Sequence, residues 1–399
     1  MPRPPPPPPG FPARRPGRAA RLAVAAAAAL AALLAGEVLL RAGLDTAAWR
    51  LRPPGLRQTF HPSPETMPGV AGPSRFEIDC LGFRGEEPDP AARYRILALG
   101  GSTVECLYLD QDEAWPALVQ ARLRAVAPAL LPQVFNGGTS GRTTRDHAVQ
   151  VPRLLAQHPE IDLVLLVPGV NDLALFLAQG PAYDPGFLAR PGAEESLLPH
   201  AFARVPLSVP TGEPWWRRTG WWRLAALAKD RLAPPPRAQD ESGAVYARWR
   251  VHRAGASDLR AALPDLAPLL DELRCNLAAI ADRCTAAGRR LVLATHPAVW
   301  APDLPPATRS LLWMGGVGPF QEEPGAAYYT PEALAAGLAA VNGAIAGLAA
   351  ARNLECLDLA GALGADPALF YDDVHLNEAG ARRAAEVVAD FLLARPPFR

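Results

Sequence analysis

From Tyr94 to the C-terminus, short apolar segments alternate with segments in which apolar residues recur at helical spacing. The short segments, expected as strands, are residues 95–99, 134–136, 162–167, 291–295 and 355–359. The expected helices are residues 115–126, 143–157, 265–287, 331–350 and 378–393. Apolar runs of about five residues that alternate with helices indicate parallel strands buried on both faces. Because crossovers between such strands are right-handed, the pattern predicts an α/β fold, a three-layer αβα sandwich around a five-stranded parallel sheet.

Residue types that take part in catalysis lie in the loops after the expected strands. Ser102 follows the first strand and two glycines, Gly141 and Asn171 follow the second and third strands, and His375 comes after the fifth. Ligands of open parallel sheets bind beyond the carboxyl ends of the strands, so we expect these residues to meet at one edge. There, a backbone N–H at Gly141 and the amide of Asn171 would suit an oxyanion hole for acyl transfer.

Ser102 and His375 have the residue types of a nucleophile and its base. A serine hydroxyl is inert until a base removes its proton, and His375 is the best candidate for that base. Asp372 precedes His375 by three residues, so its carboxylate can orient the imidazole, in the chain order Ser, Asp, His of a catalytic triad. Asp373 is an alternative partner for His375, and Ser102 could instead only cap a helix.

Four sequence blocks, each located after an expected strand, resemble the characteristic blocks of the SGNH hydrolases, the GDSL-like family. These blocks are Gly100-Gly101-Ser102-Thr103, Asn136-x-Gly138-x-x-Gly141-x-Thr143, Gly169-x-Asn171-Asp172 and Asp372-x-x-His375. The resemblance covers roughly residues 95–395 and implies a flavodoxin-like αβα sandwich that uses no metal and no cofactor. It also implies a role for each site residue. Ser102 would be the nucleophile and one oxyanion donor, Gly141 and Asn171 the other donors, and His375 the base that Asp372 orients.

The nucleophile block departs from the family's name-giving motif in two positions. Gly101 stands where that motif has Asp, and Thr103 stands where it has Leu. Many relatives share the Gly-Gly-Ser-Thr form, so activity is still expected. Together with the segment Cys80-Leu-Gly-Phe-Arg-Gly85 and the apolar N-terminal run, this form resembles membrane-anchored bacterial members of the family.

The N-terminal 75 residues divide into three expected parts. Residues 1–21 form a basic, Pro-rich tail for which no packed structure is expected. Residues 22–40 are an Ala/Leu-rich run, broken only by Gly36 and Glu37, of about the 20 residues that cross a bilayer. Residues 41–75 are rich in Pro and Gly and are expected as a linker, followed by the hydrolase domain at 76–399. A cleaved signal peptide and an ordinary buried helix remain alternatives to a transmembrane anchor.

Arginines precede the apolar run, so the positive-inside rule places the tail in the cytoplasm and the rest of the chain outside. With the resemblance above, this predicts a single-pass protein of the bacterial inner membrane whose catalytic domain is periplasmic. The membrane is then one partner of the chain, and the sequence names no protein partner.

Residues 180–260 are expected as an insertion in the hydrolase domain, directly after the Asn171 loop. The insertion is rich in Pro and mixes tryptophan with basic residues: Trp215, Trp216, Trp221, Trp222, Arg217, Arg218 and Arg223. Such a mixture suits a membrane interface, and it also suits sugar stacking or a lid over the site. A small packed subdomain with core tryptophans is a further alternative. In each case we expect the insertion to border the active site.

Charge and cysteine content exclude several other classes of protein. Lys plus Arg and Asp plus Glu both number 40, so nothing global indicates nucleic acid as a partner. The five cysteines include no CxxC pair and no Cys/His cluster, which argues against a zinc site. Asp372, Asp373 and His375 lack further ligands at a useful spacing for a metal.

Two further polar residues each have two interpretations. His296 follows the fourth expected strand and would face the same edge as Ser102, where it could touch substrate or only support a loop. Arg84 follows a Gly-Phe pair and could reach a substrate carboxylate or pair with an acidic side chain.

The sequence therefore predicts an anchored, extracytoplasmic serine hydrolase that cleaves an ester through an acyl-enzyme. The expected substrates are O-acetyl groups on envelope polysaccharide, and then a lipid or other acyl ester. Acyl transfer to a sugar hydroxyl would use the same triad and is the chemical alternative. A binding protein on a retired hydrolase fold is the alternative from another class.

Overall fold

The computed structural model describes residues 1, 3, 17–44, 49–206, 209, 214–232 and 242–399. The chain divides into two compact units. A helical unit comprises Met1–Ala47 and Glu213–Pro234, and a sheet unit comprises Ala48–Gly212 and Pro235–Arg399. The middle of the expected insertion thus belongs to the helical unit, whereas both of its ends belong to the sheet unit.

Five parallel strands form the central sheet of the sheet unit, in the spatial order β4-β3-β5-β7-β9. Their bounds are β3 (Tyr94–Gly100), β4 (Pro132–Asn136), β5 (Leu163–Val167), β7 (Arg290–Ala294) and β9 (Glu355–Leu357). The apolar runs of the sequence explain the buried position, since Ile96, Leu97 and Val164 are fully inaccessible to solvent. Taken in chain order this is the 2-1-3-4-5 arrangement of flavodoxin-like folds, and it confirms the predicted fold class.

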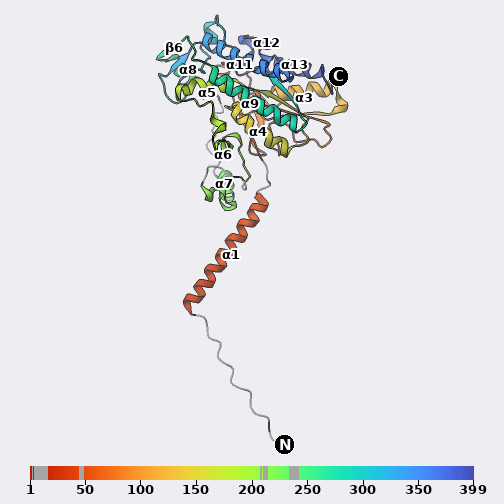
Figure 1. Ribbon diagram of the computed structural model, residues 1–399, viewed down its shortest axis with the longest axis vertical. Coiled ribbons are helices and arrows are strands. Elements are labelled where there is room, and N and C mark those ends of the chain that lie inside the picture. The colour runs from red at the N-terminus through yellow and green to blue at the C-terminus, as the bar shows by residue number, and fades with distance from the viewer. Residues whose placement is uncertain (2, 4–16, 45–48, 207–208, 210–213, 233–241) are drawn as a thin grey trace. The chain divides into compact units, whose positions relative to one another are not determined.

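Helices cover both faces of this sheet. On one side α3 (Trp115–Val126) packs against α13 (Glu378–Leu393). On the other side α4 (Thr144–Gln157), α9 (Ala267–Ala286) and α11 (Pro331–Ala351) lie side by side, and α5 (Val170–Gln179) packs on α9 and α11 (Figure 1). The expected helices all form, with ends that differ from the predicted ones by at most two residues.

The residues expected as a linker are in part folded into the sheet unit. Strands β1 (Arg57–Phe60) and β2 (Ser74–Glu77) pair in antiparallel orientation. Phe60 and Met67 are completely buried, and the N–H of Ala71 donates to the Glu378 carboxylate at 2.7 Å. The prediction for 41–75 was therefore wrong from about residue 49 onward, because its proline and glycine residues form turns between buried apolar side chains.

Shorter elements complete the sheet unit. Strands β6 (Asp258–Arg260) and β8 (Ala327–Tyr329) pair in parallel away from the central sheet. The short helices are α2 (Ser102–Glu105), α6 (Ala193–Ala201), α8 (Ala244–Ala254), α10 (Pro306–Arg309) and α12 (Leu359–Leu363).

The helical unit consists of α1 (Arg18–Leu44), a 3₁₀ turn η4 (Trp215–Arg218) and α7 (Gly220–Leu232). Helix α1 is longer than the expected span of 22–40, and most of the expected tail lies outside the described residues. Among the described residues, α1 and α11 are both long and apolar enough to cross a membrane. They differ in burial, since α11 is partly buried on the sheet whereas no residue in the apolar window of α1 is buried.

Candidate active site

Ser102 begins the short helix α2 directly after β3, at the carboxyl edge of the sheet. Its Oγ lies 2.6 Å from Nε2 of His375. Gly101, which precedes it, leaves room for a neighbour, because a Cβ at this position would lie 2.4 Å from Nδ2 of Asn171. The glycine in place of the motif's aspartate therefore allows the Asn171 amide to approach the turn at residues 100–105, named the nucleophile turn here after the role expected for Ser102.

Asp372 holds His375 on the side opposite to Ser102. Its Oδ2 lies 2.7 Å from Nδ1 of His375, and its Oδ1 accepts the backbone N–H groups of Val374 and His375 at 3.0 and 2.9 Å. Burial by itself raises the pKa of Asp372, but the charge and hydrogen bonds of His375 bring it below its ordinary value. The carboxylate therefore stays ionised and fixes the imidazole with Nε2 directed at Ser102.

Asp373 faces a different set of donors. Its carboxylate accepts Nε1–H of Trp300 at 2.8 Å and the backbone N–H groups of Trp313 and Met314 at 2.7 and 3.2 Å. Burial and the nearby Asp372 charge raise the pKa of Asp373. The geometry thus makes Asp372, and not Asp373, the partner of His375.

Trp313 is a member of this group that the sequence did not indicate. Its Nε1–H donates to Oδ2 of Asp372 at 2.9 Å, the same oxygen that faces His375. The indole also stacks on the His375 ring, with centroids 6.5 Å apart and planes at 10°, and Tyr371 stacks on that ring at 5.4 Å. Trp313 lies 59 residues before Asp372 and outside the four blocks, so no local signal identifies it.

Gly141 and Asn171 lie beside Ser102 in one cavity. Gly141 adopts a positive φ of 75°, which glycine tolerates without strain. The Asn171 amide donates one N–H to the carbonyl of Arg142 at 2.9 Å, which leaves its second N–H for a ligand. The structure therefore brings together all five residues that the sequence singled out.

Glu105 ties the Gly141 loop to the nucleophile turn. Its buried carboxylate accepts both the backbone N–H of Ser140, at 2.7 Å, and the Ser140 hydroxyl, and it forms an ion pair with Arg52. The two backbones can approach because residue 138 is glycine, where a Cβ would lie 2.2 Å from the N–H nitrogen of Glu105. Sequence reasoning missed Glu105 as well, although it lies only three residues after Ser102.

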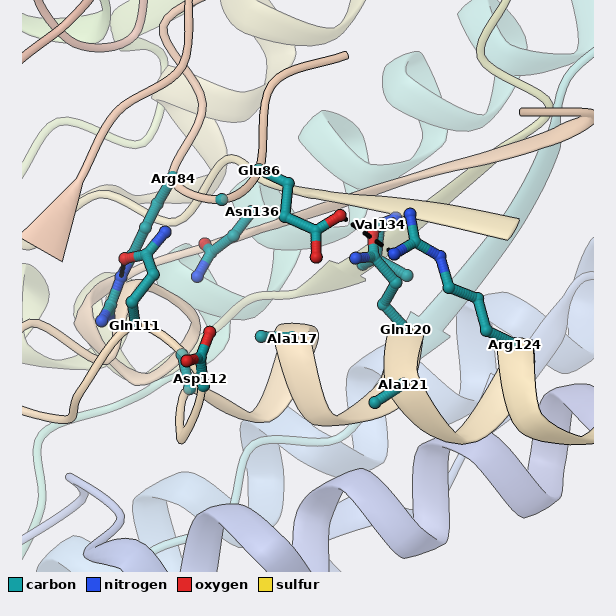
Figure 2. Close-up of a pocket in the computed structure, with 12 residues that line it drawn as sticks. Arg84, Glu86, Gln111, Asp112, Ala117, Gln120, Ala121, Arg124, Val134 and Asn136 are labelled. Carbon is teal, nitrogen blue, oxygen red and sulfur yellow. Dashed lines mark hydrogen bonds and ion pairs between the residues drawn. The ribbon is translucent and has the colours of Figure 1, made fainter. Parts of the chain in front are cut away.

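Arg84 also stabilises the nucleophile turn. Its guanidinium donates to the carbonyls of Glu105, Cys106 and Leu109 at 2.5 to 2.7 Å, and it is fully buried. Figure 2 shows Arg84 at the wall of a separate cavity of about 220 Å³, which Ser102 and His375 do not line. Neither interpretation from the sequence holds, since Arg84 reaches backbone carbonyls rather than a substrate or an acid.

His296 contacts the nucleophile turn without facing the cavity. Its Nε2 lies 3.0 Å from Oγ1 of Thr103, and its Nδ1 lies 2.9 Å from the carbonyl of Pro297. Burial lowers the pKa of His296 to about 4, so the ring is neutral at pH 7. The supporting role, rather than contact with substrate, fits this geometry.

The cavity beside Ser102 has a volume of about 600 Å³. Its wall is largely apolar and aromatic and includes Ala174, Leu175, Phe187, Leu197, Tyr246, Trp249, Trp313, Met314 and Phe320. Phe187, Leu197, Tyr246 and Trp249 belong to the expected insertion, which therefore borders the site as predicted. The four tryptophans between 215 and 222 belong to the helical unit and not to the sheet unit that carries this cavity.

Two arginines of helix α8, in the insertion, bond to the loops on either side of Trp313 and before Asp372. Arg250 donates to the carbonyls of Leu311 and Tyr371 at 2.9 and 3.0 Å. Arg253 donates to the carbonyls of Met314 and Tyr329. The insertion therefore stabilises the loop that carries Trp313.

The sequence profile of the GDSL-like Lipase/Acylhydrolase family matches residues 98–383, a range that contains all five site positions. The chain therefore belongs to the GDSL-like lipase/acylhydrolase family. It is a hydrolase that acts on ester bonds.

Several solved structures are similar to this chain. An alpha/beta hydrolase enzyme from the metagenome of Lake Arreo in Spain is 16% identical, with a TM-score of 0.39 over 76% of this chain and 95% of that one. An acetylxylan esterase from Geobacillus stearothermophilus is 16% identical, with a TM-score of 0.38 over 77% of this chain and 96% of that one. A putative lipolytic protein of the G-D-S-L family from Desulfitobacterium hafniense is 11% identical, with a TM-score of 0.37 over 75% and 99% of the two chains. The comparison with curated proteins gave no match.

Replacement of Glu105 by Gln is expected to lower the free energy of unfolding by about 3–5 kcal/mol, because it leaves Arg52 without its buried counter-charge. The measurement is chemical denaturation of the purified full chain.

Glu86→Gln is the matched control. Glu86 pairs with Arg124 at 2.9 Å on the surface, as Figure 2 shows, and its loss should cost less than about 1 kcal/mol. Equal losses in the two variants would contradict the structural role of Glu105.

Proposed function

We propose that this chain is a serine hydrolase that cleaves its ester through an acyl-enzyme on Ser102. The observation that carries the proposal is the continuous line of contacts from Ser102 Oγ to His375 Nε2, at 2.6 Å, and from His375 Nδ1 to Asp372 Oδ2, at 2.7 Å. A base within hydrogen-bond distance of a hydroxyl, itself oriented by a carboxylate, is the arrangement that activates a serine.

In the proposed reaction, Ser102 Oγ attacks the ester carbonyl carbon while its proton moves to His375 Nε2. The backbone N–H groups of Ser102 and Gly141 and the free amide N–H of Asn171 stabilise the oxyanion that forms. His375 then gives the proton to the leaving alcohol, and the acyl group stays on Ser102. Water attacks the acyl-enzyme, His375 takes its proton and returns it to Ser102, and the carboxylic acid leaves. The residues of the chain supply each step, so the proposal requires no cofactor.

The shape of the cavity guides the choice of substrate. An acetyl group would occupy only a small part of a cavity of about 600 Å³ whose wall is mostly aromatic and aliphatic. Burial of apolar groups there favours binding by about 0.8 kcal/mol for each methylene. We therefore propose a lipid or other acyl ester, rather than an O-acetyl polysaccharide, as the substrate class.

Helix α1 supports anchoring in a membrane. It is apolar, with no buried residue along the window that could span a bilayer, and Arg18 and Arg21 stand at its N-terminal end. By the positive-inside rule, the N-terminus would face the cytoplasm and the hydrolase the periplasm. The proposal is therefore a single-pass, extracytoplasmic enzyme of the bacterial inner membrane.

Ser102→Ala is expected to reduce the turnover of p-nitrophenyl esters on the order of 10⁴-fold or more, because the variant lacks the hydroxyl on which the acyl-enzyme is proposed to form. Ser310→Ala, which removes an exposed hydroxyl that donates to the carbonyl of Ala307 at the end of α10, should leave turnover unchanged. The rates are measured on the detergent-solubilised full chain, and unchanged activity of Ser102→Ala would refute the mechanism.

Lengthening the acyl group from acetate to butyrate and hexanoate should raise kcat/KM, by up to about fourfold for each methylene that the cavity buries. The assay uses the p-nitrophenyl esters of the three acids under identical conditions. A steady fall of kcat/KM from acetate to hexanoate would instead support O-acetyl esters as the substrate class.

Trp313→Phe is expected to lower kcat by about 10- to 100-fold, since it removes a hydrogen bond of about 1.5–3 kcal/mol to the charged Asp372 while keeping an aromatic ring. The matched control is Trp300→Phe, which removes an indole N–H from the neighbouring carboxylate of Asp373. Thermal unfolding and kcat are measured for both variants. Equal losses of kcat would mean that Trp313 acts only through general stability.

A further inference from the structure

The apolar run of α1 is interrupted by Gly36, a small residue of the kind that lets another helix approach closely, and by Glu37, whose charge is costly in a membrane unless a partner compensates for it. Helix α7 supplies that partner within the helical unit (Figure 1). The Glu37 carboxylate accepts the backbone N–H of Gly220 at 2.9 Å and that of Trp221 at 3.3 Å. It therefore satisfies the first N–H groups of α7, which have no partner inside their own helix. Arg41, one turn further along α1, neutralises the same carboxylate at 2.7 Å.

Gly36 makes room for Trp221. A Cβ at residue 36 would lie 2.3 Å from the Trp221 ring, and the indole N–H of Trp221 donates to the carbonyl of Leu33 at 3.1 Å. Gly220 of α7 likewise lets the two helices come close together, because a Cβ at Gly220 would lie 2.7 Å from Cβ of Leu40. The α1 residues Leu33, Gly36, Glu37 and Leu40 follow the spacing of one helical face. This face of α1 is thus built to receive the start of α7.

The solvent-exposed side chains of η4 and the start of α7 include all four tryptophans of this segment, and Trp221 remains partly exposed beside α1. Trp215 is 77% exposed, and Trp216, Trp221 and Trp222 are each about 40% exposed. Trp216 and Trp222 meet edge to face at 4.7 Å, and the Arg217 guanidinium lies over both rings at 5.1 and 5.9 Å. Arg218, Arg223 and Lys229 add positive charge to the same segment.

We propose that residues 214–232 form an interfacial collar on α1, a segment whose tryptophans insert into the headgroup region of the phospholipid bilayer. The position at which α7 docks along α1 supports lipid as the partner of these tryptophans. Glu37 lies three residues before Leu40, the last residue of the apolar run, or about 5 Å along the helix axis. Tryptophan concentrates at this level of a membrane, and basic side chains there attract anionic headgroups.

The collar rests on the proposed membrane anchoring and extends it, because it assigns to the bilayer a segment that is distant in sequence from the anchor. It also gives the tryptophan-rich part of the insertion a role of its own, since these four indoles belong to the helical unit whereas Ser102 belongs to the sheet unit. The collar gives Gly36 and Glu37 a common purpose, which is to dock and cap α7 at the end of the membrane span.

The test uses the full chain reconstituted into vesicles of phosphatidylcholine and phosphatidylglycerol, either plain or brominated near the top of the acyl chains. Flotation of the vesicles first reports whether the protein is anchored. Bromine then quenches only indoles in contact with lipid, and the collar contains four of the nine tryptophans of the chain. The proposal predicts that brominated vesicles lose up to four-ninths of the tryptophan emission.

Two sets of variants connect the quenching to the collar. Replacement of the four collar tryptophans by Phe should abolish the quenching while flotation and ester turnover persist. Gly36→Leu should reduce the quenching, because it displaces Trp221. Gly43→Leu, on the same helix but with nothing within 4 Å of its Cβ, should leave the quenching unchanged.

Equal emission from plain and brominated vesicles, for a protein that floats with them, would overturn the collar but not the anchor. Quenching that persists in the four-fold Phe variant would overturn it too. A protein that does not float would refute both anchor and collar and leave the Ser102 mechanism untouched.

Discussion

A single line of hydrogen bonds connects the hydroxyl of Ser102, the two ring nitrogens of His375, the carboxylate of Asp372 and the indole of Trp313. The parts of this line come from places far apart in the sequence, at the end of β3, before α13, and in the loop after β7. An error of about 1 Å in any of them would misalign a catalytic group, so the surrounding structure must hold all three segments at once. Much of the packing near the site serves this purpose.

Two kinds of support are visible. The nucleophile turn is fastened by buried charged groups, with Arg84 on its backbone carbonyls and Glu105 on the loop that carries Gly141. The His375 side is fastened by aromatic rings and by α8, whose Arg250 reaches the carbonyl of Tyr371. The insertion thus contributes to the site through packing and through the wall of the cavity.

The fold, and the convergence of the five candidate site residues at one edge of its sheet, were predictable, because both leave local signals. Apolar runs of strand length identify the sheet. The blocks around Ser102, Gly141 and Asn171 come shortly after its strands, and the His375 block lies further on, between α12 and α13. Trp313 and Glu105 were not predictable, since their importance depends on contacts with residues distant in sequence. The segment from residue 49 to residue 75 was misjudged for a related reason, because its few apolar side chains are buried against elements that follow later in the chain. The docking of α7 on Gly36 and Glu37 likewise joins residues about 180 positions apart.

The central claim is that His375 activates Ser102 as the nucleophile. Its most direct test is the reaction of the full chain with a fluorophosphonate, followed by mass spectrometry of the intact protein and its peptides. The account predicts one adduct on the peptide that contains Ser102, formed rapidly in the wild type and on the order of 10³-fold or more slowly in His375→Ala. An adduct on another residue, or equal rates in the two proteins, would contradict it.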